Sequence, residues 1–360
     1  MEQYELQTEL LNTIKKLRAY GIEDENQNKI VLAAPAYGTA PKFEPQHYLR
    51  AYMCGGDVGK IALDGSVMTI GIKCEQYAHK YKGIIPEEAR ILDPSSSATE
   101  TSRLKAIVSD KYLKYAVAAT AAYSLKSDEN SEKERLVETM IMDYRYQHSG
   151  SAAVDMEMQY SGRDHMGWTR DRKPGCHYVV EREHLGKTWY NEYEFAPDDT
   201  FSPRVDLMVL NDEGIGFVEL KVDNENCENL ESHINHMRYI LTHKDIFAAD
   251  AERRLDVLNR CGLLENEMLY NLEKWRVTND IWCGILFVGQ QGQVEESKEM
   301  IKTYKTQMGN DIKCAFVGLD VIKAHRLKLD SKVFLTTDMF MAEYYKGIFN
   351  NEREVEDNAF

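Results

Sequence analysis

The stretch RVDLMVLNDEGIGFVELKV, residues 204–222, decides the fold of this chain. It consists of two apolar runs of strand length, joined by a polar turn that ends in Gly214. This order is typical of a β-hairpin, because apolar and β-branched residues favour strands while Asn, Asp and Gly favour tight turns. Each run nevertheless carries charge, Asp206 in the first and Glu219 and Lys221 in the second, where a buried strand is expected to have none.

The register of the hairpin brings these charges together. If the turn is symmetric, Leu210 pairs with Ile215, and counting back puts Asp206 opposite Glu219, with roughly 5 Å between their Cβ atoms. Lys221 points to the same face, because side chains two residues apart in a strand share a face. Two carboxylates held so closely repel each other, so one must be protonated or a cation must lie between them. The sequence therefore predicts a site for a hard divalent cation beside a lysine.

A solvent-exposed hairpin is the alternative interpretation of the same charges. Its outer face would then be polar throughout, but that face also carries Met208, Leu210, Ile215 and Phe217. Charges on a largely apolar face usually need an ionic partner or a metal. The pattern therefore favours a buried functional site over a solvated face.

Asp206 followed by Glu219-Leu220-Lys221 resembles the signature of the PD-(D/E)xK nuclease superfamily. The resemblance implies that Asp206 and Glu219 bind Mg²⁺, for which Mn²⁺ can substitute, with the backbone carbonyl of Leu220 as a further ligand. It also implies that Lys221 orients or activates the attacking water. The proline that often precedes the first Asp in that superfamily is absent, since Val205 stands there.

The same resemblance implies a further acidic residue on a first helix, which the sequence predicts at 134–147. Glu138 is the favoured candidate, and Glu134, one turn earlier on the same face, is the alternative. An exposed acidic helix face would explain either residue without any role in a site.

A second helix, predicted at 230–243, holds accessory candidates. In the resembled superfamily this helix often carries a Gln-x-x-x-Tyr pattern, and here Asn235 and Tyr239 stand at those places. His236 is a further candidate, because it shares a helix face with His233 and the two could form a metal or proton-transfer pair. A pair of surface histidines is the alternative.

Composition fits a packed globular protein of the cytoplasm. The chain has 360 residues, of which 43% are hydrophobic and 29% charged. Its seven cysteines are scattered and lack a Cys-x-x-Cys spacing, which favours reduced thiols over disulfides or a zinc site. No apolar run approaches the length of a membrane span, so no membrane partner is expected.

The net charge and the local charge of the chain give opposite indications about a nucleic-acid partner. The net charge of −15 argues against a non-specific nucleic-acid binder, which would usually be basic. Salt screens charge beyond about 10 Å, however, so local basic stretches still count. One spans 163–173 and the other 323–332. The first supplies the nucleic-acid-binding candidates Arg163, Trp168, Arg170, Arg172 and Lys173. Ordinary solvated loops are the alternative interpretation.

The fold class predicted is α/β, with a restriction-endonuclease-like core whose mixed central sheet is flanked by helices. An apolar run at 281–289, a helix at 294–307 and a strand at 314–319 predict a parallel crossover unit within residues 131–330. A separate N-terminal α+β region, residues 1–130, contains no identifiable site and could sense a ligand, recognise substrate or mediate oligomers. Residues 331–360 are predicted to form a C-terminal helix, at 333–348, and a polar tail.

Further boundaries within the N-terminal region are predicted from periodicity and composition. Residues 2–19 and 104–125 have helical spacing of apolar side chains, and 30–34 and 67–72 are short strand candidates. The polar run 126–133 is predicted to break the chain between the two regions.

These observations predict a metal-dependent nuclease that hydrolyses phosphodiester bonds, with DNA favoured over RNA. A nuclease-fold protein that binds nucleic acid or regulates a partner without catalysis is the alternative. A hydrolase acting on another phosphate ester is a third interpretation. The sequence leaves open whether the protein is a monomer or a homo-oligomer.

Overall fold

The computed structural model describes residues 2–21, 29–34, 47–53, 56–64, 67–71, 85–92, 95–124, 129–143, 150–159, 177–184, 187–194, 204–223, 230–342 and 345–349. The basic segment at 163–173 and the predicted tail at 350–360 lie outside these residues. None of the described helices is both long enough and apolar enough to span a membrane.

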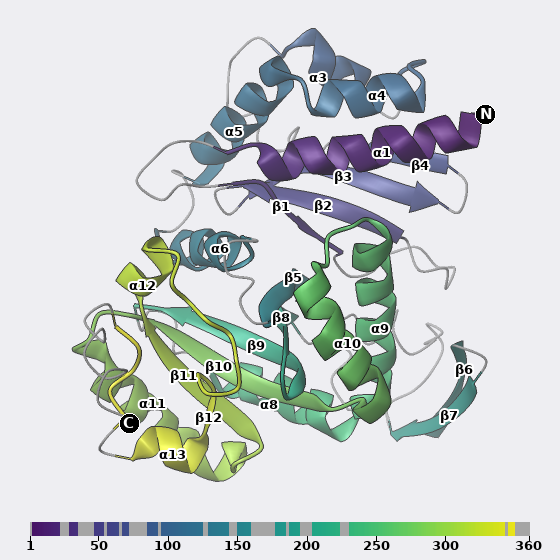
Figure 1. The fold of residues 1–360 in the computed structure, drawn as a ribbon. Helices are drawn as coiled ribbons and strands as arrows, with labels where there is room; N and C mark the ends of the chain where they lie inside the picture. Colours follow the sequence, from purple (N-terminus) through teal and green to yellow (C-terminus); the bar gives the residue numbers. More distant parts are fainter. Residues whose placement is uncertain are drawn as a thin grey trace.

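A six-stranded mixed sheet forms the centre of the molecule (Figure 1). In spatial order its strands are β12 (Leu335–Thr336), β11 (Ile312–Gly318), β10 (Ile281–Gly289), β9 (Gly214–Val222), β8 (Arg204–Asn211) and β5 (Ala152–Gln159). Strands β9, β10 and β11 run parallel, and the other three run antiparallel to their neighbours. The predicted mixed α/β sheet is thus confirmed.

Helices cover both faces of this sheet. One face packs against α8 (Leu230–Thr242), α9 (Lys244–Arg260), α10 (Asn266–Thr278) and α11 (Gln293–Met308), in a core that includes Phe217 and Ile285. The other face packs against α6 (Glu129–Ile141) and α12 (Leu319–Lys323), in a core that includes Val218 and Leu286. The alternation of side chains along β9 and β10 explains why each strand, buried along its whole length, supplies both cores.

The N-terminal region forms its own antiparallel sheet. Its strands, in order, are β1 (Val31–Ala33), β2 (His47–Met53), β3 (Gly56–Asp64) and β4 (Val67–Gly71). Helices α1 (Glu2–Ala19), α3 (Glu87–Ile91), α4 (Glu100–Ile107) and α5 (Asp110–Ser124) lie on the side of this sheet away from the central sheet (Figure 1). The predicted N-terminal α+β region is therefore present.

Helix α6 lies between the two sheets (Figure 1) and contacts both β2 and β9. Its residues Val137 and Met140 share a core with β1 residue Val31 and with β9 residue Leu220. A two-stranded hairpin, β6 (His177–His184) and β7 (Lys187–Glu194), stands apart from both sheets (Figure 1).

Three sequence-based boundaries were wrong. The helix expected over 104–125 is two helices, because the hydroxyl of Ser109 accepts a hydrogen bond from Tyr112 N–H and begins α5 anew. The helix expected from 134 starts already at Glu129, inside the run predicted to be a break. The helix expected at 333–348 is only α13 (Thr337–Met341), since β12 precedes it.

The chain after α13 binds the edge of β11 in place of continuing the helix. Tyr345 accepts a hydrogen bond from Phe316 N–H through its hydroxyl at 2.8 Å, and Ile348 pairs with Val317. These long-range contacts outweigh the local helical pattern of the segment.

Candidate functional site

The hairpin has the register that the sequence predicts. Leu210 pairs with Ile215 across a two-residue turn, and the pairing continues to Leu207 opposite Val218. The next positions in this register are Asp206 and Glu219. There the N–H of Leu220 donates to a side chain, Asp206 Oδ2, at 2.7 Å. The two carboxylates are therefore fixed on neighbouring strands at one end of the hairpin.

Glu219 is the centre of the charge cluster. Its Oε1 accepts a hydrogen bond from Lys221 Nζ at 2.8 Å and lies 2.7 Å from Nδ1 of His233, on helix α8. Glu219 and Lys221 are each only 3% exposed. Lys221 reaches Glu219 because residues i and i+2 of a strand share a face, and α8 covers that face.

Helix α6 adds a third carboxylate. Glu134 Oε1 lies 3.6 Å from Lys221 Nζ, so the ammonium contacts carboxylates from two elements. Glu138, the favoured candidate from the sequence, is buried one turn further along α6 and is 2% exposed. The ion pair with Lys221 makes Glu134 the stronger candidate for a direct role.

Electrostatics shift the pKa values of the two strand carboxylates in opposite directions. Burial would raise the pKa of Glu219, but Lys221 and His233 outweigh it and hold that pKa below its usual value. Burial and the adjacent Glu219 charge hold the pKa of Asp206 well above its usual range. Burial likewise raises the pKa of Glu134. Without a bound cation, Glu219 thus carries the charge that Lys221 balances, and Asp206 resists ionisation.

Lys221 remains an ammonium in this environment. Burial opposes its charge, but Glu219, Asp206 and Glu134 more than compensate and raise its pKa above the usual lysine value. A lysine so strongly held in its charged form cannot take up a proton. It can only supply positive charge and hydrogen bonds.

The donor atoms of the cluster fit a divalent cation. Asp206, Glu219 and Glu134 offer carboxylate oxygens, and the ring nitrogen of His233 lies against Glu219 Oε1 at 2.7 Å. In the described conformation no three of the described His, Cys, Asp or Glu side chains already converge as a set that could hold an ion. Lys221 is the cation that the carboxylates surround.

The accessory candidates on α8 are placed differently from one another. The ring of His236 lies 6.0 Å from that of His233, and burial followed by the proximity of His233 lowers its pKa. Tyr239 stacks against His243 at 4.1 Å between ring centroids and packs on the core. Asn235 is exposed. Of the two histidines, His233 is therefore the one that reaches Glu219. The basic candidates Arg163, Trp168, Arg170, Arg172 and Lys173 lie outside the described residues.

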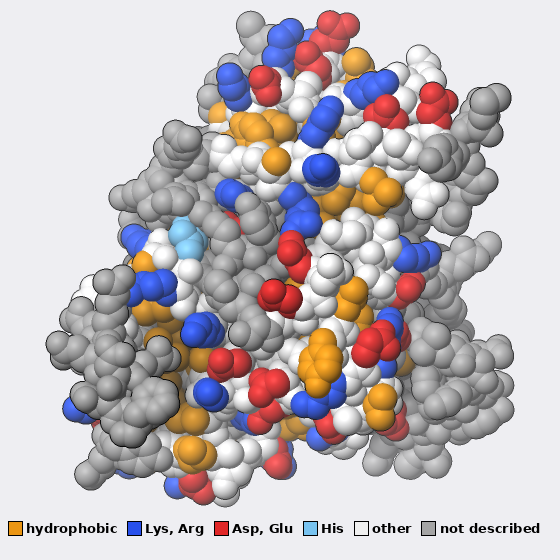
Figure 2. Space-filling view, viewed as in Figure 1, with side chains coloured by type: hydrophobic (Ala, Val, Ile, Leu, Met, Phe, Trp, Pro, Cys, Tyr) orange, Lys and Arg blue, Asp and Glu red, His pale blue; other side chains and the backbone are white. Residues whose placement is uncertain are grey.

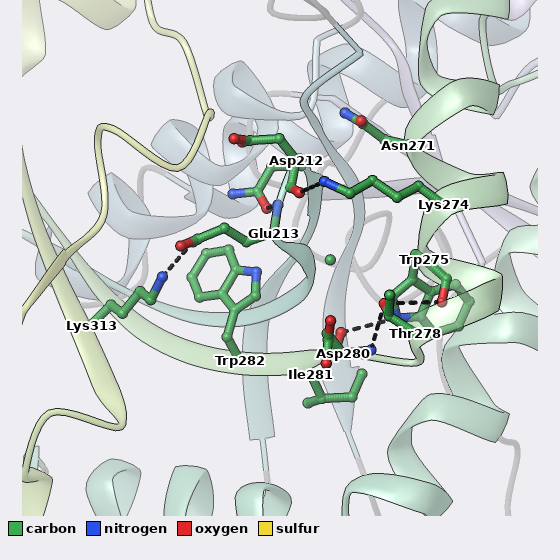
Figure 3. A pocket seen from close by; sticks show the side chains of 12 residues that line it. Asp212, Glu213, Asn271, Lys274, Trp275, Thr278, Asp280, Ile281, Trp282 and Lys313 are labelled. Carbon is green, nitrogen blue, oxygen red and sulfur yellow. Dashed lines mark hydrogen bonds and ion pairs between the residues drawn. The ribbon is translucent and has the colours of Figure 1, made fainter.

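A pocket of about 330 Å³ lies at the opposite end of the hairpin, around its turn and the start of β10 (Figure 3). Several of its polar groups already have partners. Lys313 pairs with Glu213, and Lys274 Nζ donates to the carbonyl of Asp212 at 2.6 Å. The indole N–H of Trp275 donates to the carbonyl of Asp280 at 3.0 Å. The unbalanced charges of the hairpin are therefore at its other end.

The second basic stretch is described and exposed. Lys323, Arg326, Lys328 and Lys332 are all exposed on α12 and the segment that follows it. Figure 2 shows lysine and arginine side chains over this part of the surface. Because α12 contacts α6, which carries Glu134, this basic surface belongs to the same side of the sheet as α6.

Comparisons with family models, with curated proteins and with solved structures give no match to this chain.

Proposed function

We propose that the protein is a metal-dependent nuclease that hydrolyses phosphodiester bonds, with DNA as the favoured substrate. The observation that carries this proposal is the buried cluster of Asp206, Glu219, Glu134 and Lys221, in which three carboxylates face one ammonium. Such a surplus of buried acid is costly unless a further cation offsets it. The cluster and the mixed sheet support a restriction-endonuclease-like core.

The carboxylates would hold the ion. Asp206 and Glu219 are the first candidates, with the Leu220 carbonyl and Glu134 as further oxygen donors, which suits Mg²⁺ or Mn²⁺. When bound, the ion would polarise the scissile phosphate and lower the pKa of a bound water. Asp206 has to lose its proton to serve as a ligand, and the charge of the ion favours that loss.

Lys221 would act by charge. Its ammonium cannot serve as the general base, because its surroundings hold it protonated. It would instead donate hydrogen bonds to the negative charge that develops on the phosphate oxygens. Glu134 and Glu219 hold the ammonium in place from two elements.

The exposed basic residues after α12 support a polyanionic substrate in spite of the net charge. Lys323, Arg326 and Lys328 could neutralise backbone phosphates locally, since salt confines electrostatic effects to about 10 Å. A small phosphate ester would not need such a surface. This difference favours nucleic acid as the substrate class.

A cleavage assay with Lys221→Met tests the proposal. Plasmid, linear duplex, single-stranded DNA and RNA are incubated with Mg²⁺, Mn²⁺ or EDTA. We expect metal-dependent cleavage by the wild type and a loss of about 10²–10³-fold in the variant, comparable to removal of one transition-state donor.

Lys302→Met is the matched control, because Lys302 is an exposed lysine paired with Glu299 on α11. It should keep full activity. Cleavage in EDTA, or undiminished cleavage by a folded Lys221→Met protein, would contradict the proposal. Hydrolysis of a small phosphate ester without cleavage of any nucleic acid would change the substrate class.

A further inference from the structure

The pocket at the turn of the hairpin contains a buried hydrogen-bond donor without an acceptor. Trp282, at the start of β10, lines this pocket and is 6% exposed, and its Nε1 makes no hydrogen bond to any described residue. Figure 3 shows the indole nitrogen on the side of the ring that faces the middle of the pocket. An indole N–H can only donate, so it needs an acceptor. Because nearly all buried donors have one, this N–H indicates a bound partner from outside the chain.

The packing of the indole prevents it from turning to an acceptor elsewhere. Trp282 pairs with Gly216 of β9, and a Cβ on that glycine would come within 2.2 Å of Cζ2 of the indole. At the six-membered end of the ring, Cζ3 would lie 3.1 Å from a Cβ on Gly284. The ring of Phe334 lies 4.8 Å away between centroids, and Lys313 Nζ lies 5.6 Å from the ring centroid. The fold therefore fixes the indole with its nitrogen directed away from β10 and into the pocket.

The charged groups of the same pocket differ in whether another charge balances them. Glu213 and Lys313 form an ion pair with each other, and the carboxylate of Asp212 accepts two hydrogen bonds from a neighbouring serine. Lys274 is exposed, and its Nζ donates to a backbone carbonyl. Asp280 is also exposed, and within the described part of the chain no basic side chain contacts its carboxylate. One ammonium, one carboxylate and one N–H thus remain for a ligand.

We propose that this pocket binds a small zwitterion of the amino-acid type. Its carboxylate would accept from the Trp282 N–H and the Lys274 ammonium, and its own ammonium would face Asp280. The N–H requires an oxygen acceptor, and the charge of Lys274 favours an anionic one. Three carboxylates and two ammonium groups line the pocket, which disfavours a ligand of net negative charge.

The size and the place of the pocket are consistent with such a ligand. A cavity of about 330 Å³ is within the range of small-molecule sites. Lys274 and Asp280 lie at different sides of the pocket, so the two ends of one molecule can reach them (Figure 3). The pocket lies at the opposite end of the hairpin from Glu219, so this inference does not depend on the proposed nuclease function.

NMR of the full chain labelled with ¹⁵N-tryptophan tests the proposal, with the common L-amino acids as probes. Trp282→Phe assigns the indole signal of Trp282 by its disappearance. We expect at least one amino acid to bind and to shift this signal downfield, because a carboxylate that accepts the N–H deshields its proton. The signal of Trp275, whose N–H already donates to the carbonyl of Asp280, should move less.

Calorimetry with variants at the rim of the pocket measures the two charged contacts. Lys274→Met and Asp280→Asn change exposed side chains, so both proteins should fold. Each should weaken the binding of that amino acid by about tenfold or more. Lys302→Met is the matched control, an exposed lysine on α11 outside the pocket, and should change the affinity by less than about twofold.

The N-acetyl form of the same amino acid separates its two charges, because it keeps the carboxylate and lacks the ammonium. It should bind the wild type about tenfold more weakly than the free amino acid and lose no further affinity in Asp280→Asn.

Three results would overturn the proposal. The first is that no amino acid binds, which would leave an ordered water as the acceptor of the indole N–H. The second is binding that leaves the indole signal of Trp282 unshifted. The third is equally tight binding of the N-acetyl form by the wild type.

Discussion

Two buried charge clusters of this molecule use the same kinds of residue and differ in how they are satisfied. In the first, Arg254 on α9 bonds Asp155 on β5 at 2.8 Å and Asp250 at 2.6 Å, and also donates to the carbonyl of Ala34. In the second, Asp206, Glu219 and Glu134 surround Lys221. The first cluster is buried, whereas Asp206 and Glu134 of the second are partly exposed, and three carboxylates there lie around one ammonium.

The difference lies in the second oxygen of each acid. Asp155 Oδ1 accepts the N–H of Met156 at 3.0 Å while its Oδ2 accepts from Arg254, so both oxygens have partners. In the second cluster, by contrast, Lys221 and His233 both contact Oε1 of Glu219, and Glu134 Oε1 lies 3.6 Å from Lys221 Nζ. Arg254 therefore ties the N-terminal sheet to the central sheet, whereas in the cluster around Lys221 a single ammonium faces three carboxylates. We propose that the first cluster is structural and that the second binds an ion.

Removing the cation of the first cluster should have the largest effect on stability. Arg254→Met leaves Asp155 and Asp250 buried without their counter-charge. We expect the free energy of unfolding to fall by about 3–5 kcal/mol in urea denaturation. Arg260→Met on the same helix is the control, because its pair with Asp256 is exposed and should be worth under about 1 kcal/mol. Equal effects of the two changes would show that the Arg254 cluster stabilises the fold no more than an exposed ion pair does.

Ion binding at the second cluster should depend on pH. Burial and the Glu219 charge raise the pKa of Asp206, so an ion that binds below this raised pKa must displace the proton. We expect the affinity for Mn²⁺ to rise with pH, by up to about tenfold per unit, until the raised pKa is passed. Calorimetry at several pH values would measure this, and Asp206→Asn should flatten the dependence. An affinity independent of pH in the wild type would show that Asp206 is already ionised.

Local rules sufficed to predict the hairpin and its site. A symmetric turn and the two-residue period of a strand fix the register, so Asp206, Glu219 and Lys221 could be placed together from sequence. The central strands at 281–289 and 314–319 were also predictable, because continuous apolar runs are typical of strands buried on both faces.

Contacts between distant segments could not be predicted in the same way. Spacing alone puts His233 and His236 on one helix face, and only the packing of α8 against β9 shows which of them meets Glu219. Strand β5 was not predicted, because a buried strand is not expected to carry a charge such as Asp155. The partner that balances this charge, Arg254, lies 99 residues further along the chain. The C-terminal segment follows the edge of β11 and not its own helical pattern for the same reason.

We propose that the acids around Lys221 bind an ion and do not stabilise the fold. Because the pKa of Asp206 is raised, its contribution to stability is present below the ordinary carboxyl pKa and is lost as pH rises through the raised value. Asp206→Asn removes that loss, while the amide oxygen can still accept the N–H of Leu220.

The most direct test is therefore urea unfolding of metal-free Asp206→Asn at pH 8, with Asp212→Asn as its control. Asp212 lies in the turn of the same hairpin, where hydrogen bonds from Ser331 outweigh burial and lower its pKa. We expect the free energy of unfolding of Asp206→Asn at pH 8 to exceed that of the wild type, and that of Asp212→Asn not to exceed it. A loss of stability in Asp206→Asn would show that the carboxylate is structural, and would contradict the proposal that Asp206 serves to bind an ion.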